Sequence, residues 1–491
     1  MLGPWRPHAQ FQAWLEEQLR ILLPQYVAKI KFHAAALEKV YILDLDPFME
    51  LIKPQYSSTG RPALNQPELF RAVVLASHYK DSISYFVQRL KVDEILAIAC
   101  GFEPGNTPGV GTLYDFFNRL WLSYAPTKVL RPPYKKKKEK LKANEKLPPD
   151  NPDRVTELVN QVLKGESFAQ GPERLLQKIL MECAVKPSAK FKLLGNTLKL
   201  TLAGDGAPLE TGASYFGKKV CQCKKEGIYR CVCPRYYTDP SANWGWDSYH
   251  ERWFYGHTLY CLSAANSFND LPLLINLKQA SAHDSITFVP AYAQLRSLLP
   301  FFKFDRALLD SAHDAYDIYR LLNIDEIEPF IELNKRGKKK SLPEASINQD
   351  GIPVCPANLQ MIYWGLHLKR QRIKWRCPMY EKLTDCPSKK PCSQSKYGRV
   401  VYTRPQTDYR LFTKTPRGSK AWKKAFARRS SVERSIKRIL VDYRIEQARA
   451  RSVKQWFWLA TLAALNQHLD AQIAVTECSL LERLGLKLRT A

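Results

Sequence analysis

Asp205 is the first residue whose surroundings are typical of a metal-binding carboxylate. It lies between Gly204 and Gly206, at the end of an alternating apolar and polar run that begins at Thr197. Because side chains alternate between the two faces of a strand, the pattern predicts Asp205 on the polar face, at the strand's end, where the glycines leave its carboxylate uncovered. A simple Gly-Asp-Gly turn is the alternative.

Asp310 repeats this arrangement further along the chain. A strand-like run over residues 304–309 leads into it, and the Ser-Ala-His-Asp segment after it is typical of a helix start. Helix capping is the alternative role, because Asp side chains accept hydrogen bonds from free backbone N–H groups. We expect Asp314 and Asp317 to be helix-start or exposed residues. The similar segment 281–285 has no comparable strand leading straight into it, so it ranks below Asp310 as a candidate.

Glu433 is the single acidic residue among ten lysines and arginines between Lys414 and Arg438. It shares one helical face with Arg429 and Lys437, which lie four residues away on either side. A surface ladder of ion pairs, worth tenths of a kcal/mol, is one interpretation. The other is a metal carboxylate flanked by cations that hold phosphates, and the basic excess favours it.

These three carboxylates suit metal-assisted cleavage of a phosphodiester. The reaction needs a deprotonated nucleophile and a neutralised charge on the leaving oxygen, and two divalent cations about 4 Å apart supply both. Oxygen ligands select magnesium or manganese. Asp205 is then the candidate to bridge two ions, with Asp310 and Glu433 each completing the shell of one.

The elements that must position these acids follow from the periodicity of the sequence. Alternation predicts one strand before Asp205 and another before Asp310. The run from Trp422 onward lacks glycine and proline, and its apolar residues recur at helical spacing, which predicts a helix that docks on a sheet. This stripe consists of Val432, Ile436, Ile439 and Tyr443.

The net charge indicates a polyanionic partner, because 75 Lys and Arg residues outnumber 47 Asp and Glu residues and give a formal charge of +28. Hydrophobic residues at 45% and charged residues at 25% are ordinary for a folded protein. A chain of 491 residues predicts two to four domains. No spanning helix, amphipathic anchor or export signal is visible in the sequence. We therefore expect a cytoplasmic, nucleoid-associated protein with no membrane partner and with reduced or metal-bound cysteines.

The part of the chain before the first acid divides into two regions. Residues 1–130 read as a bundle of short helices that binds nucleic acid, with dimer contacts or scaffolding as the alternative. Residues 131–195 form a basic linker followed by a helical segment. Lys136 and Lys137 belong to the lysine run of this linker, which either tracks phosphates or is simply solvated.

Two groups of four cysteines are candidates for structural zinc. The first group consists of Cys221, Cys223, Cys231 and Cys233. A hairpin would gather its thiols on one side, because alternate strand residues share a face, but the spacing is not the usual Cys-x2-Cys, so four free thiols are the alternative. The second, more widely spread group consists of Cys355, Cys377, Cys386 and Cys392. Neither group is expected to be catalytic, because zinc with four thiolates has no open coordination position.

Residues 337–412 are basic and loop-rich, and Trp364 and Trp375 lie among their lysines and arginines. The indole rings stack on unpaired bases in one interpretation. In the other they belong to a core.

These residues together resemble the DDE transposases of bacterial insertion sequences over most of the chain. In that family the first Asp ends the first core strand, as Asp205 does in LAGDGAP. The second Asp ends the fourth strand, as Asp310 does in ALLDSAHDAYD.

The family's Glu lies in a signature similar to Tyr-x2-Arg-x3-Glu-x6-Lys. Here the signature reads Phe426-x2-Arg429-x3-Glu433, and its last position falls on Leu440. Lys437 or Arg438 must therefore take the place of the family's lysine. These departures leave open any hairpin-forming step that depends on the Tyr and the Lys.

The resemblance implies an α/β protein with an RNase H-like core, an all-α N-terminal region and a helical C-terminal tail. The first part of the core is expected over residues 196–336, followed by a basic, cysteine-containing insertion over 337–412. Residues 413–491 are expected to supply the glutamate helix and the tail.

The resemblance also implies metal-dependent cleavage of the element's ends and strand transfer into target DNA. Asp205, Asp310 and Glu433 would hold two Mg²⁺ or Mn²⁺ ions, and the active complex would be a homodimer or a larger assembly on DNA. Arg429, Lys437 and Arg438 are the cations expected to contact DNA. A structure-selective nuclease without strand transfer and a catalytically silent, transposase-derived DNA-binding protein are the alternatives.

Overall fold

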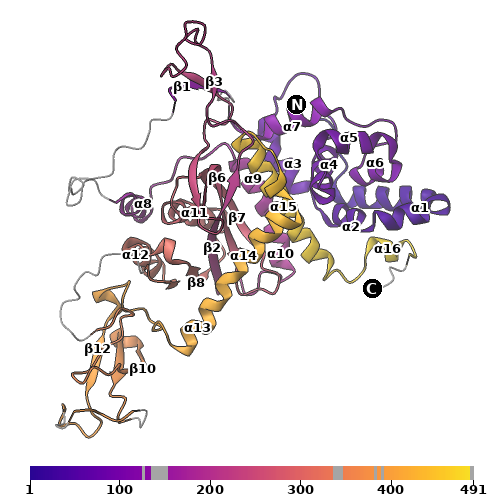
Figure 1. Ribbon diagram of the computed structural model, residues 1–491. Helices are drawn as coiled ribbons and strands as arrows, with labels where there is room; N and C mark the ends of the chain where they lie inside the picture. Colours follow the sequence, from indigo (N-terminus) through magenta and orange to yellow (C-terminus); the bar gives the residue numbers. More distant parts are fainter. Residues whose placement is uncertain (124–127, 134–152, 335–346, 381–383, 389–391, 487–491) are drawn as a thin grey trace.

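The computed structural model describes residues 1–123, 128–133, 153–334, 347–380, 384–388 and 392–486. A bundle of helices contributed by the N-terminal part of the chain lies beside a central sheet that is flanked by further helices. A small separate sheet, carrying β10 and β12, extends away from the central sheet (Figure 1). The chain therefore has a mixed α/β architecture with several sheets.

The N-terminal helices begin and end at residues that the sequence marks clearly. Ser82 and Asp93 accept hydrogen bonds from the backbone N–H groups of Tyr85 and Leu96, and so cap two successive helices. The second of these helices ends at Gly101, whose φ of 99° is a left-handed conformation that favours glycine. The helices of this region are α1 (His8–Phe32), α2 (Ala34–Ile42), α3 (Asp46–Ile52), α4 (Gln66–Tyr79), α5 (Ile83–Val92), α6 (Glu94–Cys100) and α7 (Val110–Leu120).

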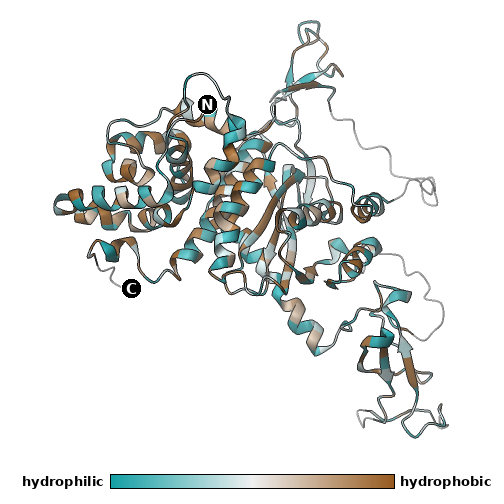
Figure 2. Cartoon of the chain, turned by 180° about the vertical axis from the view of Figure 1, so that it is seen from behind, coloured by the Kyte–Doolittle hydropathy of each residue, from teal (hydrophilic) through white to brown (hydrophobic). Residues whose placement is uncertain are grey.

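The central sheet has six strands in the order β5-β6-β2-β8-β9, with β7 paired to β6. β2 is antiparallel to β6 and parallel to β8, which is in turn parallel to β9. Most of these strands are predominantly hydrophobic (Figure 2), as expected where both faces of a sheet are covered. The strands are β2 (Leu200–Glu210), β5 (Asn243–Asp247), β6 (Arg252–Ala264), β7 (Pro272–Gln279), β8 (Phe304–Leu309) and β9 (Glu328–Ile331).

Helices cover both faces of the sheet, as two neighbouring residues of β6 demonstrate. Cys261 contacts Ser435 of α14, whereas the hydroxyl of Tyr260 lies 2.8 Å from Nε2 of His313. Because successive strand residues point to opposite faces, α14 and His313 lie on opposite sides of the sheet. The helices packed around it are α8 (Arg154–Leu163), α9 (Arg174–Leu180), α10 (Lys186–Lys190), α11 (Asp284–Leu298), α12 (Tyr316–Ile324), α13 (Lys420–Phe426), α14 (Ser430–Lys437) and α15 (Val453–Ile473).

The strand that carries Asp205 differs from the one predicted. It begins at Leu200 and continues to Glu210, so Asp205 lies in its middle and not at its end. The extension arises because β6 pairs with β2 as far as Glu210, whereas the parallel partner β8 ends opposite Gly204. Asp205 shares a face of the strand with Thr201, as the alternation predicted, but this face is covered, because Thr201 is buried.

The stripe predicted from Trp422 onward is confirmed at its buried positions, although the helix is interrupted. α13 is followed by a 3-10 turn, by α14 and by a π-helical segment, Arg438–Asp442. Val432, Ile436 and Ile439 are buried. Because these residues pack into the core, the opposite side of α14, which carries Glu433, faces away from the core.

Residues 347–380 and 392–412 contain the small sheet of three antiparallel strands. Its strands are β10 (Ile362–His367), β11 (Arg372–Arg376) and β12 (Val400–Thr403). Trp375 is buried in a separate small core with Cys355, Met361 and Ile373. Trp364 is 48% exposed, and Arg376 lies over its ring. One tryptophan of this segment is thus a core residue, and the other faces solvent.

A third sheet joins β1 (Val129–Arg131), β4 (Arg235–Tyr237) and β3 (Lys218–Lys219). The described part of the tail ends with α16 (Leu480–Arg483). Among the helices of the described residues, none is both long and apolar enough to span a lipid bilayer.

Candidate active site

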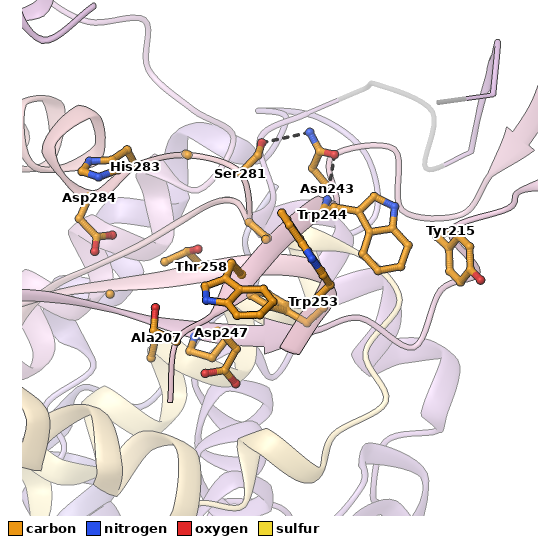
Figure 3. A pocket seen from close by; sticks show the side chains of 18 of the residues that line it. Ala207, Tyr215, Asn243, Trp244, Asp247, Trp253, Thr258, Ser281, His283 and Asp284 are labelled. Carbon is orange, nitrogen blue, oxygen red and sulfur yellow. Dashed lines mark hydrogen bonds between the residues drawn. The ribbon is translucent and has the colours of Figure 1, made fainter. Parts of the chain in front are cut away.

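Asp205 and Asp310 line the same pocket, which has a volume of about 1310 Å³. Figure 3 shows other residues of this pocket, among them Asp284 and Trp253. Asp205 projects from β2 just beyond the point where β8 ends, and Asp310 is the residue that follows β8. The parallel register of these two strands therefore brings together two acids that are far apart in the sequence.

Glu433 is joined to Asp205 through Arg429. One guanidinium nitrogen of Arg429 donates to Oδ2 of Asp205 at 3.1 Å, and the other donates to Oε1 of Glu433. The exposed Glu433 and Arg429 lie one turn apart, as the sequence predicted. Among the described residues, the group gathered closely enough to hold a metal ion consists of four cysteines, whose possible ligand atoms all lie within 4.8 Å of one another. Asp205, Asp310 and Glu433 lie further apart than this.

Burial and neighbouring charge shift the pKa values of the two aspartates in opposite directions. Burial, together with repulsion from Asp310, raises the pKa of Asp205 to about 6, against the effect of Arg429. Burial also acts to raise the pKa of Asp310, but the hydrogen bond from His313 and the charges of His313 and Arg429 outweigh it and lower the pKa. The pocket therefore holds two carboxylates that are costly to ionise together.

A buried chain of hydrogen bonds fixes Asp310. Nδ1 of His313 lies 2.6 Å from Oδ1 of Asp310, and Nε2 lies 2.8 Å from the hydroxyl of Tyr260. A neutral imidazole that donates from Nδ1 to the carboxylate accepts at Nε2 from the tyrosine, whereas the protonated ring donates from both nitrogens. Tyr260 and His313 therefore orient one carboxylate of the pocket from the opposite face of the sheet.

Asp284, in the segment that the sequence ranked below Asp310, also lines the pocket. As the sequence indicated, no strand leads straight into it, because β7 ends at Gln279 and Asp284 begins α11. A Cβ atom at Gly206 would lie 2.6 Å from Oδ1 of Asp284, so glycine leaves the room that this carboxylate occupies. Burial is the main cause that raises the pKa of Asp284, and Asp310 adds to it. The glycine after Asp205 was the signal that could have identified this neighbour.

The corresponding acid of the second Ser-Ala-His-Asp segment, Asp314, has a different role. Its side chain is only 1% exposed, and both of its oxygens accept hydrogen bonds from Arg410 at 2.8 and 2.7 Å. Asp314 is therefore buried and not exposed, but it lies two residues before α12 begins, near a helix start, which was the other expectation. Asp317 lies in the first turn of α12, as expected, and accepts from Thr156.

The other cations predicted to bind DNA have unequal surroundings. Lys437 is exposed at the end of α14. Arg438 donates to the backbone oxygen of Asn269 at 2.7 Å and lies 3.9 Å from a carboxylate oxygen of Asp270, so it is engaged with a turn of the sheet. The structure does not describe the segment that contains Lys136 and Lys137.

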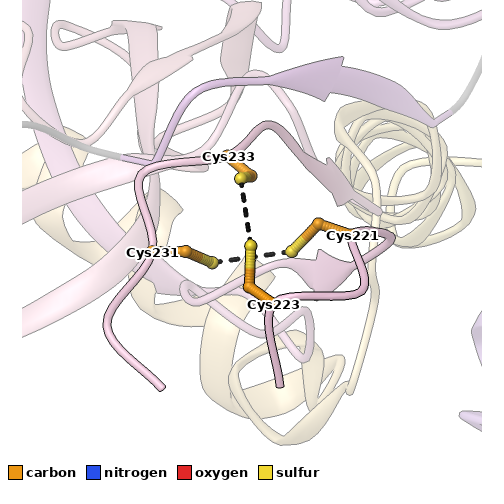
Figure 4. Close-up of side chains that lie close together, drawn as sticks. All are labelled: Cys221, Cys223, Cys231 and Cys233. Carbon is orange, nitrogen blue, oxygen red and sulfur yellow. Dashed lines mark hydrogen bonds between the residues drawn. The ribbon is translucent and has the colours of Figure 1, made fainter. Parts of the chain in front are cut away.

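The cysteines at 221, 223, 231 and 233 converge (Figure 4). The Sγ atoms of Cys221 and Cys231 are 3.5 Å apart, and those of Cys223 and Cys233 are 3.6 Å apart. Tetrahedral zinc with bonds of about 2.3 Å requires thiolates about 3.8 Å apart, so the group fits this ion. The predicted strand alternation is not the cause, because the cysteines lie in bends and turns between β3 and β4.

The second cysteine group is not gathered in this way among the residues that the structure describes. Cys355 and Cys377 are buried, and Cys392 is exposed. Cys355 packs in the small core of the β10–β12 segment.

Two segments of the chain match known protein families. Residues 354–467, which contain the β10–β12 sheet and Glu433, match the family described as Transposase DDE domain. Residues 23–119, within the N-terminal helices, match the family described as Transposase domain (DUF772). Comparisons with curated proteins and with solved structures gave no match.

Proposed function

We propose that this chain cuts the ends of a DNA element and joins them to target DNA. The premise is that the two matched segments support a DDE transposase of the insertion-sequence type. The observation that carries the proposal is the link from Asp205 through Arg429 to Glu433, beside the pocket that Asp310 also lines. Asp205 and Asp310 thus share a pocket, and Arg429 connects Asp205 to Glu433 on α14.

An RNase H-like core fits the central sheet. The antiparallel strands β7, β6 and β2 adjoin the parallel strands β8 and β9, and α11 connects β7 to β8. We propose that this core comprises residues 196–336 and is completed by 413–491. The β10–β12 segment would then be the insertion over 337–412.

Asp205, Asp310 and Glu433 are the residues proposed to hold two Mg²⁺ or Mn²⁺ ions. The hard oxygen donors fit these ions, and the raised pKa of Asp205 is a further sign that a cation would relieve repulsion in the pocket. Bound divalent ions supply a deprotonated nucleophile and neutralise the leaving oxygen. Arg429 already neutralises Asp205 and Glu433, and would be free to hold a phosphate when ions take over that task.

Asp284 and the His313 chain complete the proposed site. Asp284 brings another carboxylate to the same pocket, next to Gly206. His313 and Tyr260 restrict the orientation of Asp310. Hydrogen-bonded partners of this kind hold metal ligands in place in many proteins.

Zinc is proposed as a structural ion at Cys221, Cys223, Cys231 and Cys233. DNA is the proposed partner, because the surface is strongly basic, and Lys437 is exposed next to the site. The N-terminal helices and a second copy of the chain are proposed to take part in the assembly on DNA.

The test is an assay with paired element ends, target DNA and Mg²⁺. We expect nicked ends and joined products with the unchanged protein. Asp205→Asn, Asp310→Asn and Glu433→Gln should each abolish both products but leave DNA binding intact. Unchanged cleavage by all three variants would show that the site is assigned wrongly.

The same assay separates the alternatives. A structure-selective nuclease would give nicked ends without joined products. A silent DNA-binding protein would give neither product while binding DNA with a steep dependence on salt.

A further inference from the structure

The pocket does not end at the acids but continues along the β5 and β6 hairpin to a group of exposed aromatic rings. Trp246 and Trp253 are paired in register across the two strands, and their ring centroids lie 5.4 Å apart. They are 50% and 53% exposed, and Tyr249 in the connecting turn is 89% exposed. We call these three residues the aromatic wall.

A second set of rings, which includes Tyr215 and Trp244, lines the same pocket. Tyr215 lies 4.8 Å from the ring of Trp244, which lies 5.6 Å from that of Tyr255. Tyr215 comes from the segment that leads into the four-cysteine loop, and Trp244 comes from β5, as Figure 3 shows. Arg235, on the far side of that loop, also lines the pocket.

Rings exposed in this way are costly for a protein that binds nothing there. Each exposed indole leaves apolar surface in water, at about 25 cal/mol per Å². Two tryptophans and a tyrosine gathered at one end of an open pocket therefore indicate a ligand with flat, apolar faces. The acids at the other end, with their proposed metal ions, require that the same ligand carry a phosphate.

The distance between the two ends suits a nucleic acid strand. Cys261 pairs with Asp205 on the neighbouring strand, and Trp253 lies eight residues before it on β6. At about 3.4 Å per residue this is about 27 Å along the sheet, which is several nucleotides. In a duplex, each base face is already covered by its neighbours, so rings can stack only on bases that are unpaired.

We propose that the aromatic wall binds unpaired bases of the DNA strand whose phosphate lies at Asp205, so that the substrate is held open for several nucleotides from the point of cleavage. The proposal rests on the proposed function, because that function brings the phosphate to the acids. Stacking of a base on an aromatic side chain is worth about 1–3 kcal/mol and accepts every base. The aromatic wall would therefore select opened DNA rather than a sequence.

The test compares two labelled DNA probes by fluorescence anisotropy without divalent ions. One is a fully paired duplex, and the other has the same sequence with four unpaired nucleotides at one end. We expect the unchanged protein to bind the opened probe more tightly. Trp246→Ala with Trp253→Ala should remove this preference and weaken binding of the opened probe by at least 10-fold, with little change for the paired one. Trp253→Phe should retain most of the preference.

Two controls make the outcome specific. Trp364→Ala removes another exposed tryptophan, outside the pocket, and should leave the preference unchanged. Asp205→Asn should abolish cleavage but keep the preference, so that failure of the proposed function and failure of the aromatic wall are distinguishable. A double tryptophan variant that is folded by circular dichroism and still prefers the opened probe would overturn the proposal.

Discussion

Arg429 joins two acids that belong to different elements. Its guanidinium donates to Asp205 on the strand and to Glu433 on the helix. The positive charge of Arg429 thus lies between two carboxylates. The same two negative charges would stabilise a divalent ion. Asp310 and Asp284, two other acids of the pocket, have no such arginine contact among the described hydrogen bonds.

Asp284→Asn should separate function from stability. Burial raises the pKa of this carboxyl, which means that its ionised form is unfavourable in the folded protein. We expect the amide to lower the cleavage rate and Mn²⁺ affinity by about 10-fold or more, while the thermal unfolding temperature stays equal or rises. Metal affinity would be measured by titrating the protein with Mn²⁺ and following the magnetic resonance signal of the free ion. The unfolding temperature would be measured by calorimetry.

Asp314→Asn is the matched control, because it changes the same position of the second Ser-Ala-His-Asp segment. This change removes a charge from the two hydrogen bonds with Arg410. We expect a lower unfolding temperature and no direct effect on Mn²⁺ affinity. If Asp284→Asn behaves as Asp314→Asn does, Asp284 is a structural residue.

Tyr260→Phe should test the orientation of Asp310 from the other face of the sheet. The change leaves Nε2 of the buried His313 without its hydroxyl partner, and loss of such a partner costs about 10-fold to 100-fold in metal affinity or activity. We expect a lower kcat with an unchanged KM for DNA. An unchanged kcat over a series of Mg²⁺ concentrations would argue against a positioning role.

At this scale the sequence predicts the residue types well and their contacts poorly. Asp205 between its glycines and the isolated acid Glu433 were visible as candidates; Asp205 lines the pocket, and Glu433 is linked to it through Arg429. The place of Asp284 in the pocket was not visible in the sequence, because it depends on the space left by Gly206 of β2. Contacts of this kind depend on strand register, which local patterns do not give.

At the scale of elements, pairing partners decided where strands end. The period-two pattern ahead of Asp205 predicted a strand, but β2 runs five residues past the acid because β6 pairs with it over that length. Alternation also failed to reveal that both faces are covered, since Thr201 is buried next to leucines. The apolar stripe around Val432 was predictable, because a helix that docks on a sheet needs only its own periodicity.

The long helix α15 supplies a pH-dependent contribution to stability through His468. Burial lowers the pKa of this histidine to about 4, whereas the unfolded chain binds the proton near 6.5. Stability is therefore fully present above 6.5 and falls as the pH drops toward 4, by up to about 3 kcal/mol. We expect His468→Gln to show a shallower loss of the free energy of unfolding between these values in denaturant titrations. Parallel curves for both proteins would contradict the assignment.

At the scale of the whole molecule, composition predicted the kind of partner but not the arrangement of parts. The excess of lysine and arginine indicated a polyanion, and both matched segments are transposase families. How the helical region, the central sheet and the β10–β12 sheet pack could not be read from the chain, because packing depends on which apolar faces meet. The four-cysteine loop belongs to this arrangement, because the segments on both sides of it line the pocket.

The last prediction concerns the four-cysteine loop and its effect on the pocket. If Cys221, Cys223, Cys231 and Cys233 hold zinc, the ion fixes the turns that place Tyr215 and Arg235 in the pocket. The loop has no hydrophobic core of its own, because its thiols are the residues that converge and its aromatic residue Tyr229 is exposed. Metal binding is then its main source of order.

We expect about one zinc per chain by elemental analysis, and none in a Cys223→Ser, Cys233→Ser variant. Cys478→Ser, which changes an exposed cysteine elsewhere, should keep the ion. Removal of zinc by a chelator should make the loop the first site of tryptic cleavage, at its lysines and arginines, and should weaken binding of opened DNA while the central sheet stays folded. Equal zinc content in all three proteins would exclude the site. If the protein binds one zinc per chain but its removal leaves the loop unchanged, the ion does not shape the pocket.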